Sequence, residues 1–469
     1  MPERLSAGVK VVVLAAGRGT RMASSRSKVM HEVGGLPMIE HLLRLAREVG
    51  TGAPLVVASP SQADLLSYLD GRAEVAMQPS PTGTAGALLA AVPLLPRESP
   101  VLVLAGDMPL LRAATLDRLA KAFGDSSAGA AVLTSTMADP SGFGRILRRP
   151  EGTLLAIVEE ADAPVLAGPA EVNLGAYVFD LAAVERVLRK LPTDNAKGEL
   201  YLSWAPQAIE AGAVTVAAPD PQEGLQVNDR VQLAAVEAAM RARTLSRLML
   251  SGVTVIDPGA TWVDCDVQVG ADTVIHPGTV LGGQTTVGSE CVLGPFAELH
   301  DCQVGDRCQV GRSHLRGCKL DSGVDVGPFN RVRHGSEMGP GSHLGTFNEV
   351  VRSRVGAGSQ IPHLSYVGDS ELGEDVNVGA GSITANWDGQ RKHRTVIEDG
   401  ARLGSDTILV APIRVGRRGY TAAGSVVTTD VPEGALAVAR APQRNILGWV
   451  ARRRPGARTV ADVRGEEEQ

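Results

Sequence analysis

Aliphatic residues return every six positions through much of the second half of the sequence, from about Val269 to Val427. Glycine directly follows several of them, as at Gly270 and Gly288. The first unbroken register is Val269, Ile275, Leu281, Val287, Leu293 and Leu299. A period of six fits neither a helix, with about 3.6 residues per turn, nor a strand whose faces alternate every second residue. It is typical of hexapeptide repeats in a parallel β-helix, where three short strands make one coil and the aliphatic residue points inward.

The composition suits a solenoid of small stacked residues. The chain has 54 glycines, which would permit tight corners, and only 3% of its residues are aromatic. A glycine-rich β-sandwich with chance spacing is the alternative, but it does not explain so many aliphatic positions in phase. The repeat resembles the left-handed hexapeptide-repeat fold. That resemblance implies a coil that cannot bury all its surface alone and therefore forms a homotrimer.

Charge and hydropathy exclude several classes of protein. The net charge of −6 gives no support for binding to nucleic acid or to a membrane surface. The sequence has no run of eighteen apolar residues, and its first ten residues lack the apolar segment of a signal peptide. We therefore expect a cytoplasmic protein. The cysteines form no CxxC pair and are expected to be small apolar fillers of the coil: Cys265, Cys291, Cys302, Cys308 and Cys318.

Residues 9–230 show a different pattern, in which short apolar runs alternate with helix-like stretches. This alternation predicts βαβ units and a mostly parallel, Rossmann-like sheet covered by helices, with ligands at the carboxyl ends of the strands. A helix is expected between Asp229 and Ser251, ahead of the repeat. The predicted domains are an α/β domain over residues 1–230, a linker helix over 231–251, and a β-helix with a charged tail over 252–469.

A glycine-containing loop follows the first predicted strand. It reads Leu14-Ala15-Ala16-Gly17, then reaches Arg21 and, seven residues later, Lys28. The loop lacks the third glycine of a dinucleotide fingerprint and the GK[ST] ending of a P-loop. Its backbone N–H groups could approach an anion, and two fixed cations could neutralise a leaving pyrophosphate. An ordinary strand–turn with solvated basic residues is the alternative.

A second candidate follows another apolar strand, at Ala105-Gly106-Asp107. A buried carboxylate is costly without a partner, and Mg²⁺ bound to phosphates would supply one. A turn aspartate that caps the next helix is the alternative for Asp107 taken alone.

Both stretches closely resemble the sugar-1-phosphate nucleotidyltransferase family. The resemblance implies UTP as substrate, Arg21 and Lys28 as catalytic cations, and Mg²⁺ held by Asp107 and Asn228. It further implies a base-reading loop at Gln78, Gly83 and Thr84, and a sugar site at Gly144, Glu159 and Asn173. The implied UTP and UDP-sugar residues are Leu14, Ala15, Ala16, Gly17, Lys28, Gln78, Gly83, Thr84, Ala105, Gly106, Asp107, Gly144, Glu159, Asn173 and Asn228.

The most informative stretch of the repeat is His363-Leu364-Ser365-Tyr366-Val367-Gly368-Asp369. Acetyl transfer from a thioester to an amine needs a base that is neutral near pH 7, and histidine suits that role. A lone histidine would more often be structural. This string, however, resembles the acetyltransferase half of the bifunctional family that makes UDP-N-acetylglucosamine, and the resemblance covers residues 9–450.

That resemblance implies His363 as the base and acetyl-CoA as co-substrate. It implies an amino-sugar phosphate site at Arg333, Val351, Tyr366 and Asn377. The implied acetyl-CoA residues are Ala380, Asn386, Trp387, Ser405, Ala423 and Arg440. The interruption of the repeat after Thr384 is expected to be an extruded loop that completes a neighbouring subunit's site in the trimer.

The sequence departs from the family in places that bear on acetyl transfer. Val351 stands where the family has a phosphate-binding lysine, with Arg352 beside it; Trp387 replaces a tyrosine, and Pro362 precedes the histidine. The expected product, UDP-N-acetylglucosamine, would feed peptidoglycan and outer-envelope glycans. Two alternatives stay open. The β-helix could be only a trimerisation scaffold for a uridylyltransferase, or the nucleotidyltransferase could use another base or sugar.

Overall fold

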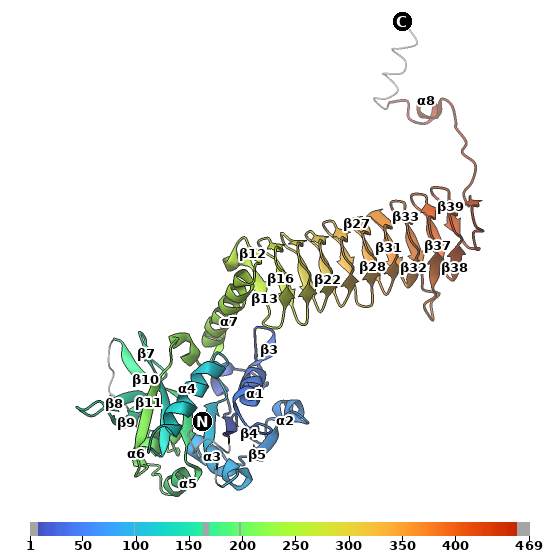
Figure 1. Ribbon diagram of the computed structural model, residues 1–469. Coiled ribbons are helices and arrows are strands. Elements are labelled where there is room, and N and C mark those ends of the chain that lie inside the picture. The colour runs from blue at the N-terminus through green and yellow to red at the C-terminus, as the bar shows by residue number, and fades with distance from the viewer. Residues whose placement is uncertain (1–7, 98, 163–167, 197, 457–469) are drawn as a thin grey trace. The chain divides into compact units, whose positions relative to one another are not determined.

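The computed structural model describes residues 8–97, 99–162, 168–196 and 198–456. The chain divides into two compact units (Figure 1). The first comprises Met1–Gln268 with Val280–Gln284, and the second comprises Val269–Thr279 with Thr285–Gln469. No helix in the described parts of the chain is long and apolar enough to cross a membrane.

The first unit is built on a mixed sheet with the strand order β11-β7-β10-β6-β1-β4-β5. Its strands are β1 (Lys10–Leu14), β4 (Leu55–Ala58), β5 (Glu74–Met77), β6 (Val101–Ala105), β7 (Ala130–Met137), β10 (Ala170–Phe179) and β11 (Ala213–Ala217). Only β10 runs antiparallel to its neighbours on this path, β6 and β7. The pair β8 (Arg145–Arg148) and β9 (Leu154–Val158) extends the sheet from β10, and β2 (Glu32–Val33) pairs with β3 (Leu36–Pro37). The predicted α/β fold with a mostly parallel sheet is confirmed.

Helices cover both faces of this sheet, because successive strand residues point to opposite sides. Val11 and Val13 pack into one core with α1 (Met38–Val49), α2 (Ala63–Leu69) and α4 (Ala113–Gly124). Val12 packs into the other core with α3 (Thr84–Ala91), α5 (Leu181–Leu188) and α6 (Ala205–Ala208). With both faces buried, ligands have access only at the ends of the strands.

The predicted helix between Asp229 and Ser251 is present as α7 (Arg230–Leu250). The Asp229 carboxylate caps it by accepting a hydrogen bond of 2.9 Å from the Gln232 N–H. This helix belongs to the first compact unit, which extends to Gln268. The functional boundaries at 230 and 251 therefore stay a prediction.

The second unit is the predicted left-handed parallel β-helix. Its first sheet contains β15 (Val274–Ile275), β18 (Val292–Leu293), β21 (Gln309–Val310), β24 (Asp325–Val326), β27 (His343–Thr346), β30 (Gln360–His363), β33 (Asn377–Val378), β36 (Arg402–Leu403), β39 (Tyr420–Thr421) and β41 (Leu436–Ala437). Its second contains β19 (Glu298–His300), β22 (His314–Arg316), β25 (Arg331–Val332), β28 (Glu349–Val351), β31 (Tyr366–Gly368), β34 (Ile383–Ala385), β37 (Ile408–Val410) and β40 (Val426–Val427). Its third contains β17 (Thr286–Val287), β20 (Gln303–Val304), β23 (Lys319–Leu320), β26 (Glu337–Met338), β29 (Arg354–Val355), β32 (Ser370–Leu372), β35 (Thr395–Ile397) and β38 (Ile413–Val415).

Short strands also mark the first turns of the repeat: β12 (Thr254–Val255), β13 (Trp262–Val263), β14 (Gln268–Val269) and β16 (Val280–Gly282). The short helix α8 (Trp449–Arg453) follows the β-helix. The aliphatic ladder is buried as predicted, with Ile275, Leu293 and Ile361 fully inaccessible to solvent. Val269 is an exception: it is half-buried, and Val267 points into the core instead.

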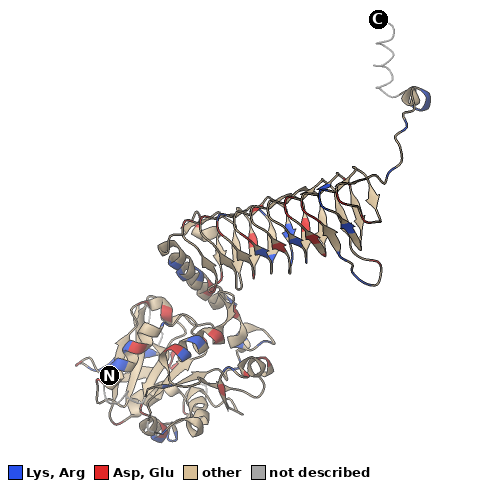
Figure 2. Cartoon of the chain, turned by 45° about the vertical axis from the view of Figure 1, so that its right-hand side comes forward, with Lys and Arg blue, Asp and Glu red and all other residues tan. Residues whose placement is uncertain are grey.

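Glycines occupy left-handed corners of the coil as expected, for example Gly323 (φ 73°) and Gly341 (φ 64°), but they also have a second role. Non-glycine residues occupy many left-handed corners, including Phe329 (φ 64°) and Leu364 (φ 52°). At Gly288 the backbone is not left-handed, but an added Cβ would lie 2.7 Å from the Gly305 carbonyl carbon in the next coil. Glycine is therefore needed there because adjacent coils approach closely. In the middle of the third sheet, charges of opposite sign alternate on successive strands at Lys319, Glu337, Arg354 and Glu371, and Figure 2 shows charged segments on adjacent strands.

The cysteines behave as expected for apolar fillers. All five are free thiols, and all except the half-buried Cys265 are buried.

Candidate functional site

A cavity of about 620 Å³ opens in the first unit where β1 and β6 end. Leu14 pairs with Ala105 at the ends of these neighbouring parallel strands, so the loops that follow them leave from the same edge. Every residue predicted for the nucleotide site lines the cavity: Leu14, Ala15, Ala16, Gly17, Arg21, Lys28, Gln78, Gly83, Thr84, Ala105, Gly106, Asp107, Gly144, Glu159, Asn173 and Asn228. Segments far apart in the sequence thus converge on one cavity.

The glycine loop is fixed at its base and open at its tip. The Ala15 N–H donates to the Val57 carbonyl and the Gly106 N–H donates to the Leu14 carbonyl, each at 2.9 Å. A Cβ added at Gly17 would meet no atom within 4 Å, so the space in front of this backbone is free for a ligand. Gly19 has a left-handed φ of 61°, and an added Cβ would lie 2.7 Å from the Lys28 Cβ. Glycine at position 19 therefore lets the loop pack against Lys28.

Lys28 joins the two predicted metal ligands. Its Nζ lies 2.5 Å from Asp107 Oδ2 and 3.3 Å from Asn228 Oδ1. The Lys28 and Asp107 side chains are each only 15% exposed, which strengthens their attraction relative to a surface pair. A carboxylate oxygen and an amide oxygen thus converge on one cation. Hard oxygen donors of this kind suit Mg²⁺, which commonly binds one or two protein oxygens and completes its shell with phosphates and water.

Asp64 holds the segment that carries Lys28, a contact that the sequence did not indicate. Its carboxylate accepts hydrogen bonds from the Ser27 N–H at 2.8 Å and from the Ser27 hydroxyl. Burial alone would raise the pKa of Asp64, but these bonds and the hydrogen bond from the Leu65 N–H together outweigh it and hold the pKa below its usual value. Arg21 lines the same cavity and is exposed, so its guanidinium is available to an anionic ligand.

The predicted base-reading loop is organised by internal hydrogen bonds. The Gln78 Nε2 donates to the Gly83 carbonyl at 3.1 Å, and the Thr84 hydroxyl accepts from the Leu202 N–H at 3.0 Å. Gly83 has a φ of 97°, and an added Cβ would lie 2.5 Å from the Leu200 carbonyl oxygen. Only glycine fits there. Gln78 therefore holds the loop shape with its amide N–H, which leaves its carbonyl oxygen for a ligand.

Two cavity residues support the predicted sugar site and were missed by sequence reasoning. The Asn173 Nδ2 donates to the Tyr177 hydroxyl at 2.6 Å, and the Ser203 hydroxyl donates to the Glu159 carboxylate. Burial, followed by the negative charge of Glu159, raises the pKa of Tyr177. The pairing of β10 with β7 shifts register between Asn173 and Tyr177. That irregularity, invisible in the sequence, brings the two side chains together.

Tyr177→Phe should weaken the binding of the sugar phosphate without abolishing it. The change leaves the buried Asn173 amide without one partner, a loss of about 1 kcal/mol or about five-fold in affinity. We expect the KM for the sugar phosphate to rise by that factor while the KM for UTP stays constant. Steady-state kinetics with each substrate varied will measure both. An equal rise in both KM values would indicate general damage to the cavity and contradict the assignment.

Most of the predicted acetyl-transfer residues of the second unit fall near two edges of its second sheet, while Asn377 lies on the first sheet. His363, Ala380, Ser405 and Ala423 lie one above another, each two residues after the inward residue of its coil, at the corner between the first and second sheets. The Asp406 N–H donates to the Ala380 carbonyl at 2.7 Å, and the Gly424 N–H donates to the Ser405 carbonyl at 2.8 Å. We call these four residues the corner column.

His363 stands at the start of the corner column on β30 and is exposed. Within the described chain its imidazole makes no hydrogen bond, so it is free to accept a proton from a ligand. Arg440 lies at the far end, where its Cδ would be 3.9 Å from a Cβ added at Gly424. Asn377 is half-buried on β33 and pairs with Gln360 and Arg402.

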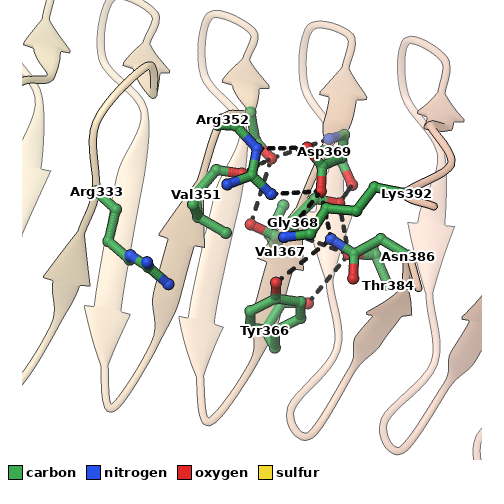
Figure 3. Close-up of polar contacts among 12 residues, drawn as sticks. Arg333, Val351, Arg352, Tyr366, Val367, Gly368, Asp369, Thr384, Asn386 and Lys392 are labelled. Atoms are coloured by element: carbon green, nitrogen blue, oxygen red, sulfur yellow. Dashed lines mark hydrogen bonds and ion pairs between the residues drawn. The ribbon is translucent and has the colours of Figure 1, made fainter. Parts of the chain in front are cut away.

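Val351, Tyr366 and Asn386 lie around Asp369, at the corner between the second and third sheets, whereas Arg333 lies apart on an earlier coil (Figure 3). The Arg352 Nε and Nη2 each lie 2.7 Å from the Asp369 carboxylate, forming a bidentate pair. The Asn386 Nδ2 donates to the same carboxylate at 2.5 Å and to the Tyr366 hydroxyl at 3.4 Å. Lys392 Nζ lies 3.9 Å from it. The Arg352 guanidinium, above all, holds the pKa of Asp369 below its usual range.

Within the part of the chain that the structure describes, no positive charge replaces the phosphate-binding lysine that the family resemblance implies at position 351. The Val351 side chain is 2% exposed, so it offers a ligand neither charge nor surface. Arg352 is bound to Asp369 and does not replace a cation at position 351 (Figure 3). Arg333 is paired with Glu349 at 3.0 Å on the same sheet. The extruded loop occurs as predicted: it leaves β34 at Asn386, and the exposed Trp387 bridges to Lys392.

Comparison with known proteins gives matches along the whole chain. Residues 11–167 match the MobA-like NTP transferase domain family, and residues 266–301 match the bacterial transferase hexapeptide family of six repeats. The Bifunctional protein GlmU of Mycolicibacterium gilvum is 43% identical over 464 residues, which cover 96% of this chain and 93% of that protein. Its counterpart in Mycolicibacterium smegmatis is 44% identical over 460 residues, covering 95% of each chain. The counterpart in Mycobacterium tuberculosis strain H37Ra is 43% identical, covering 95% of this chain and 93% of that protein.

Proposed function

The chain belongs to the family of bifunctional GlmU proteins, and we propose that it makes UDP-N-acetylglucosamine by two reactions. The second unit transfers an acetyl group from acetyl-CoA to glucosamine 1-phosphate. The first unit then transfers a uridylyl group from UTP to the resulting N-acetylglucosamine 1-phosphate and releases pyrophosphate. The observation that carries the proposal is the single cavity in which all the predicted nucleotide residues meet.

In uridylyl transfer, a phosphate oxygen of the sugar phosphate attacks the α-phosphorus of UTP. The bond from that phosphorus to the bridging oxygen breaks, and pyrophosphate leaves with the extra negative charge. Arg21 and Lys28 lie in the cavity where they would neutralise this charge. The backbone around Gly17 has open space before it for the triphosphate, and Glu159 and Asn173 would bind the sugar hydroxyls and the N-acetyl group.

Asp107 and Asn228 would hold Mg²⁺ in this reaction. The fit rests on their two oxygens, which already share one cation, the Lys28 ammonium group. When bound, Mg²⁺ would supply charge neutralisation on the phosphates. Lys28 would then turn from Asp107 toward the triphosphate.

In acetyl transfer, the amine of glucosamine 1-phosphate attacks the thioester carbonyl. The carbon–sulfur bond breaks, CoA leaves, and the proton of the amine passes to His363. The exposed imidazole, which makes no hydrogen bond to the residues that the structure describes, supports this role. The other members of the corner column, Ala380, Ser405 and Ala423, would carry the extended CoA chain. Arg333, Tyr366 and Asn377 would bind the sugar phosphate.

We expect Val351→Lys to improve the binding of glucosamine 1-phosphate. Val351 is only 2% exposed, so the first part of the lysine side chain would fill the buried position of Val351 and its longer remainder would carry the ammonium group out to the ligand. One charged hydrogen bond is worth about ten-fold in affinity. The KM for glucosamine 1-phosphate should fall by about that factor, and the KM for acetyl-CoA should not change. Val292→Lys is the matched control, because it adds the same charge at an exposed strand position on the first sheet.

We propose a homotrimer in which subunits share the acetyl-transfer sites. Asn386 and Trp387 lie at the opposite edge of the second sheet from the corner column, so one chain does not bring all predicted residues together. Exposed apolar side chains form the neighbouring column at the same corner, one residue further along each coil than the position of His363: Phe296, Phe329, Phe347 and Leu364. The rings of Phe329 and Phe347 stack with centroids 5.1 Å apart. Light scattering of the purified protein should give three times the 48.8 kDa chain mass; a monomer would contradict this proposal.

A uridylyltransferase with a purely structural β-helix is the second candidate, favoured by the departures at Val351 and Trp387. Two assays separate the candidates. Release of CoA thiol with glucosamine 1-phosphate supports our proposal, and its absence at every substrate concentration would leave uridylyl transfer only. Pyrophosphate release from UTP and dTTP, with N-acetylglucosamine 1-phosphate and glucose 1-phosphate as acceptors, tests the base and the sugar. We propose a cytoplasmic location, where UTP and acetyl-CoA are available.

A further inference from the structure

Glu223 is a carboxylate with no access to solvent, five residues before Asn228. It lies on the short 3₁₀ helix η7 (Pro221–Gly224). A buried carboxylate is costly unless hydrogen bonds replace its water. Burial is the largest influence on Glu223, and it raises the pKa of this carboxyl group. The hydrogen-bond partners of Glu223 must therefore offset the cost of burying its carboxylate.

Both partners of Glu223 lie at the beginning of α4, just after the segment that carries Asp107. The Arg112 N–H donates to Glu223 Oε2 and the Thr115 hydroxyl donates to Glu223 Oε1, each at 2.9 Å. Arg112 is the N-cap residue of α4, and its own side chain makes no capping hydrogen bond. Glu223, which is distant in the sequence, instead places a negative charge at the N-terminus of α4, where the helix dipole favours negative charge.

Further contacts join the same two segments. The Val227 N–H donates to the Asp107 carbonyl at 3.1 Å, and the Arg112 Nη2 donates to Asp220 at 2.8 Å. Residues 107–115 and 220–228 are thus fastened at both ends. The Glu223 carboxylate is inaccessible to solvent, so water cannot take the place of its partners, whereas the Asp220 side chain is 29% exposed.

We propose that Glu223 is a positioning residue for the metal: by fastening η7 to the beginning of α4, it fixes Asn228 beside Asp107 so that their oxygens meet on one cation. The inference rests on the proposed uridylyl transfer. Glu223 itself touches no ligand, since it does not line the cavity. Loss of its bonds would let the Asn228 segment move relative to Asp107, and the cost would fall on metal binding.

The test measures UTP binding to the full chain by calorimetry, once with saturating Mg²⁺ and once with a chelator. The ratio of the two dissociation constants reports the contribution of the metal. For Glu223→Gln, which keeps the shape of the side chain, we expect this ratio to fall about ten-fold, as for other residues that orient metal ligands. UTP binding without metal should be unchanged. Thr115→Val, which removes one of the two donors, should lower the ratio less.

Glu237→Gln is the matched control. The Glu237 carboxylate also accepts a backbone hydrogen bond, from the Gly34 N–H at 2.7 Å, but it does not line the cavity. Glu237→Gln should leave the ratio of the two UTP dissociation constants unchanged. Equal weakening of UTP binding with and without Mg²⁺ in Glu223→Gln and Thr115→Val would show a merely structural role and overturn the inference, as would an unchanged ratio in both. If the unaltered protein binds no UTP, the proposed function itself fails.

Discussion

His363→Ala is expected to lower the rate of acetyl transfer by orders of magnitude and to leave uridylyl transfer intact. Removal of a general base typically lowers a rate by about 10²- to 10⁴-fold. His363 is exposed at the start of the corner column and makes no hydrogen bond in the described chain, so its loss should not disturb the coil. CoA thiol release measures the first activity, and pyrophosphate release with N-acetylglucosamine 1-phosphate measures the second.

His343→Ala provides the control for this prediction. His343 lies one coil earlier on the same sheet, where its Nδ1 contacts Asp325 at 3.0 Å. It is outside the corner column, and both activities should survive its removal. Retention of acetyl transfer in His363→Ala would refute the role of His363. Loss of both activities in His363→Ala would mean that the two sites are not separable.

Lys28→Met is expected to have the opposite effect: uridylyl transfer falls about 10²- to 10³-fold, the usual cost of removing one preorganised group that stabilises developing charge. The substitution keeps most of the apolar stem and removes the ammonium group that lies 2.5 Å from Asp107. Acetyl transfer should continue unchanged. Pyrophosphate release at saturating UTP and sugar phosphate gives the loss in kcat.

Lys10→Met separates catalysis from stability. Lys10 is also a shielded lysine of the first unit, where its Nζ lies 2.7 Å from the Ala53 carbonyl and 3.0 Å from Glu74. It does not line the cavity. Lys10→Met should therefore lower the melting temperature with little change in kcat. A similar loss of kcat in both variants would indicate that Lys28→Met acts through folding, contrary to our assignment.

The sequence predicted those features that depend on local pattern. The six-residue period indicated the β-helix because every coil repeats one inward position, and Ile275, Leu293 and Ile361 are buried accordingly. The nucleotide residues could be predicted because they follow strands whose carboxyl ends meet at one edge of the sheet. The six-residue period did not predict every buried position of the β-helix, because Val269 is in register but only half-buried.

Features that depend on long-range contacts could not be predicted. The contact of Asn173 with Tyr177 needs a register shift within β10, and the bonds of Glu223 join segments more than 100 residues apart. Asp369 belongs to a recognisable sequence motif, but the motif does not indicate its partners. Arg352, Asn386 and Lys392 meet at Asp369 because the coils stack and the extruded loop folds back. The roles of Asn173, Glu223 and Asp369 therefore depend on partners that only the folded chain brings together.

One measurement tests the central claim, that a single chain carries both reactions. The purified protein is incubated with glucosamine 1-phosphate, UTP, Mg²⁺ and acetyl-CoA labelled with ¹³C in the acetyl group, and the products are identified by mass spectrometry. We predict UDP-N-acetylglucosamine with the label in its N-acetyl group, together with CoA and pyrophosphate. Formation of UDP-glucosamine without label, or of no UDP-sugar unless N-acetylglucosamine 1-phosphate is supplied, would contradict the account.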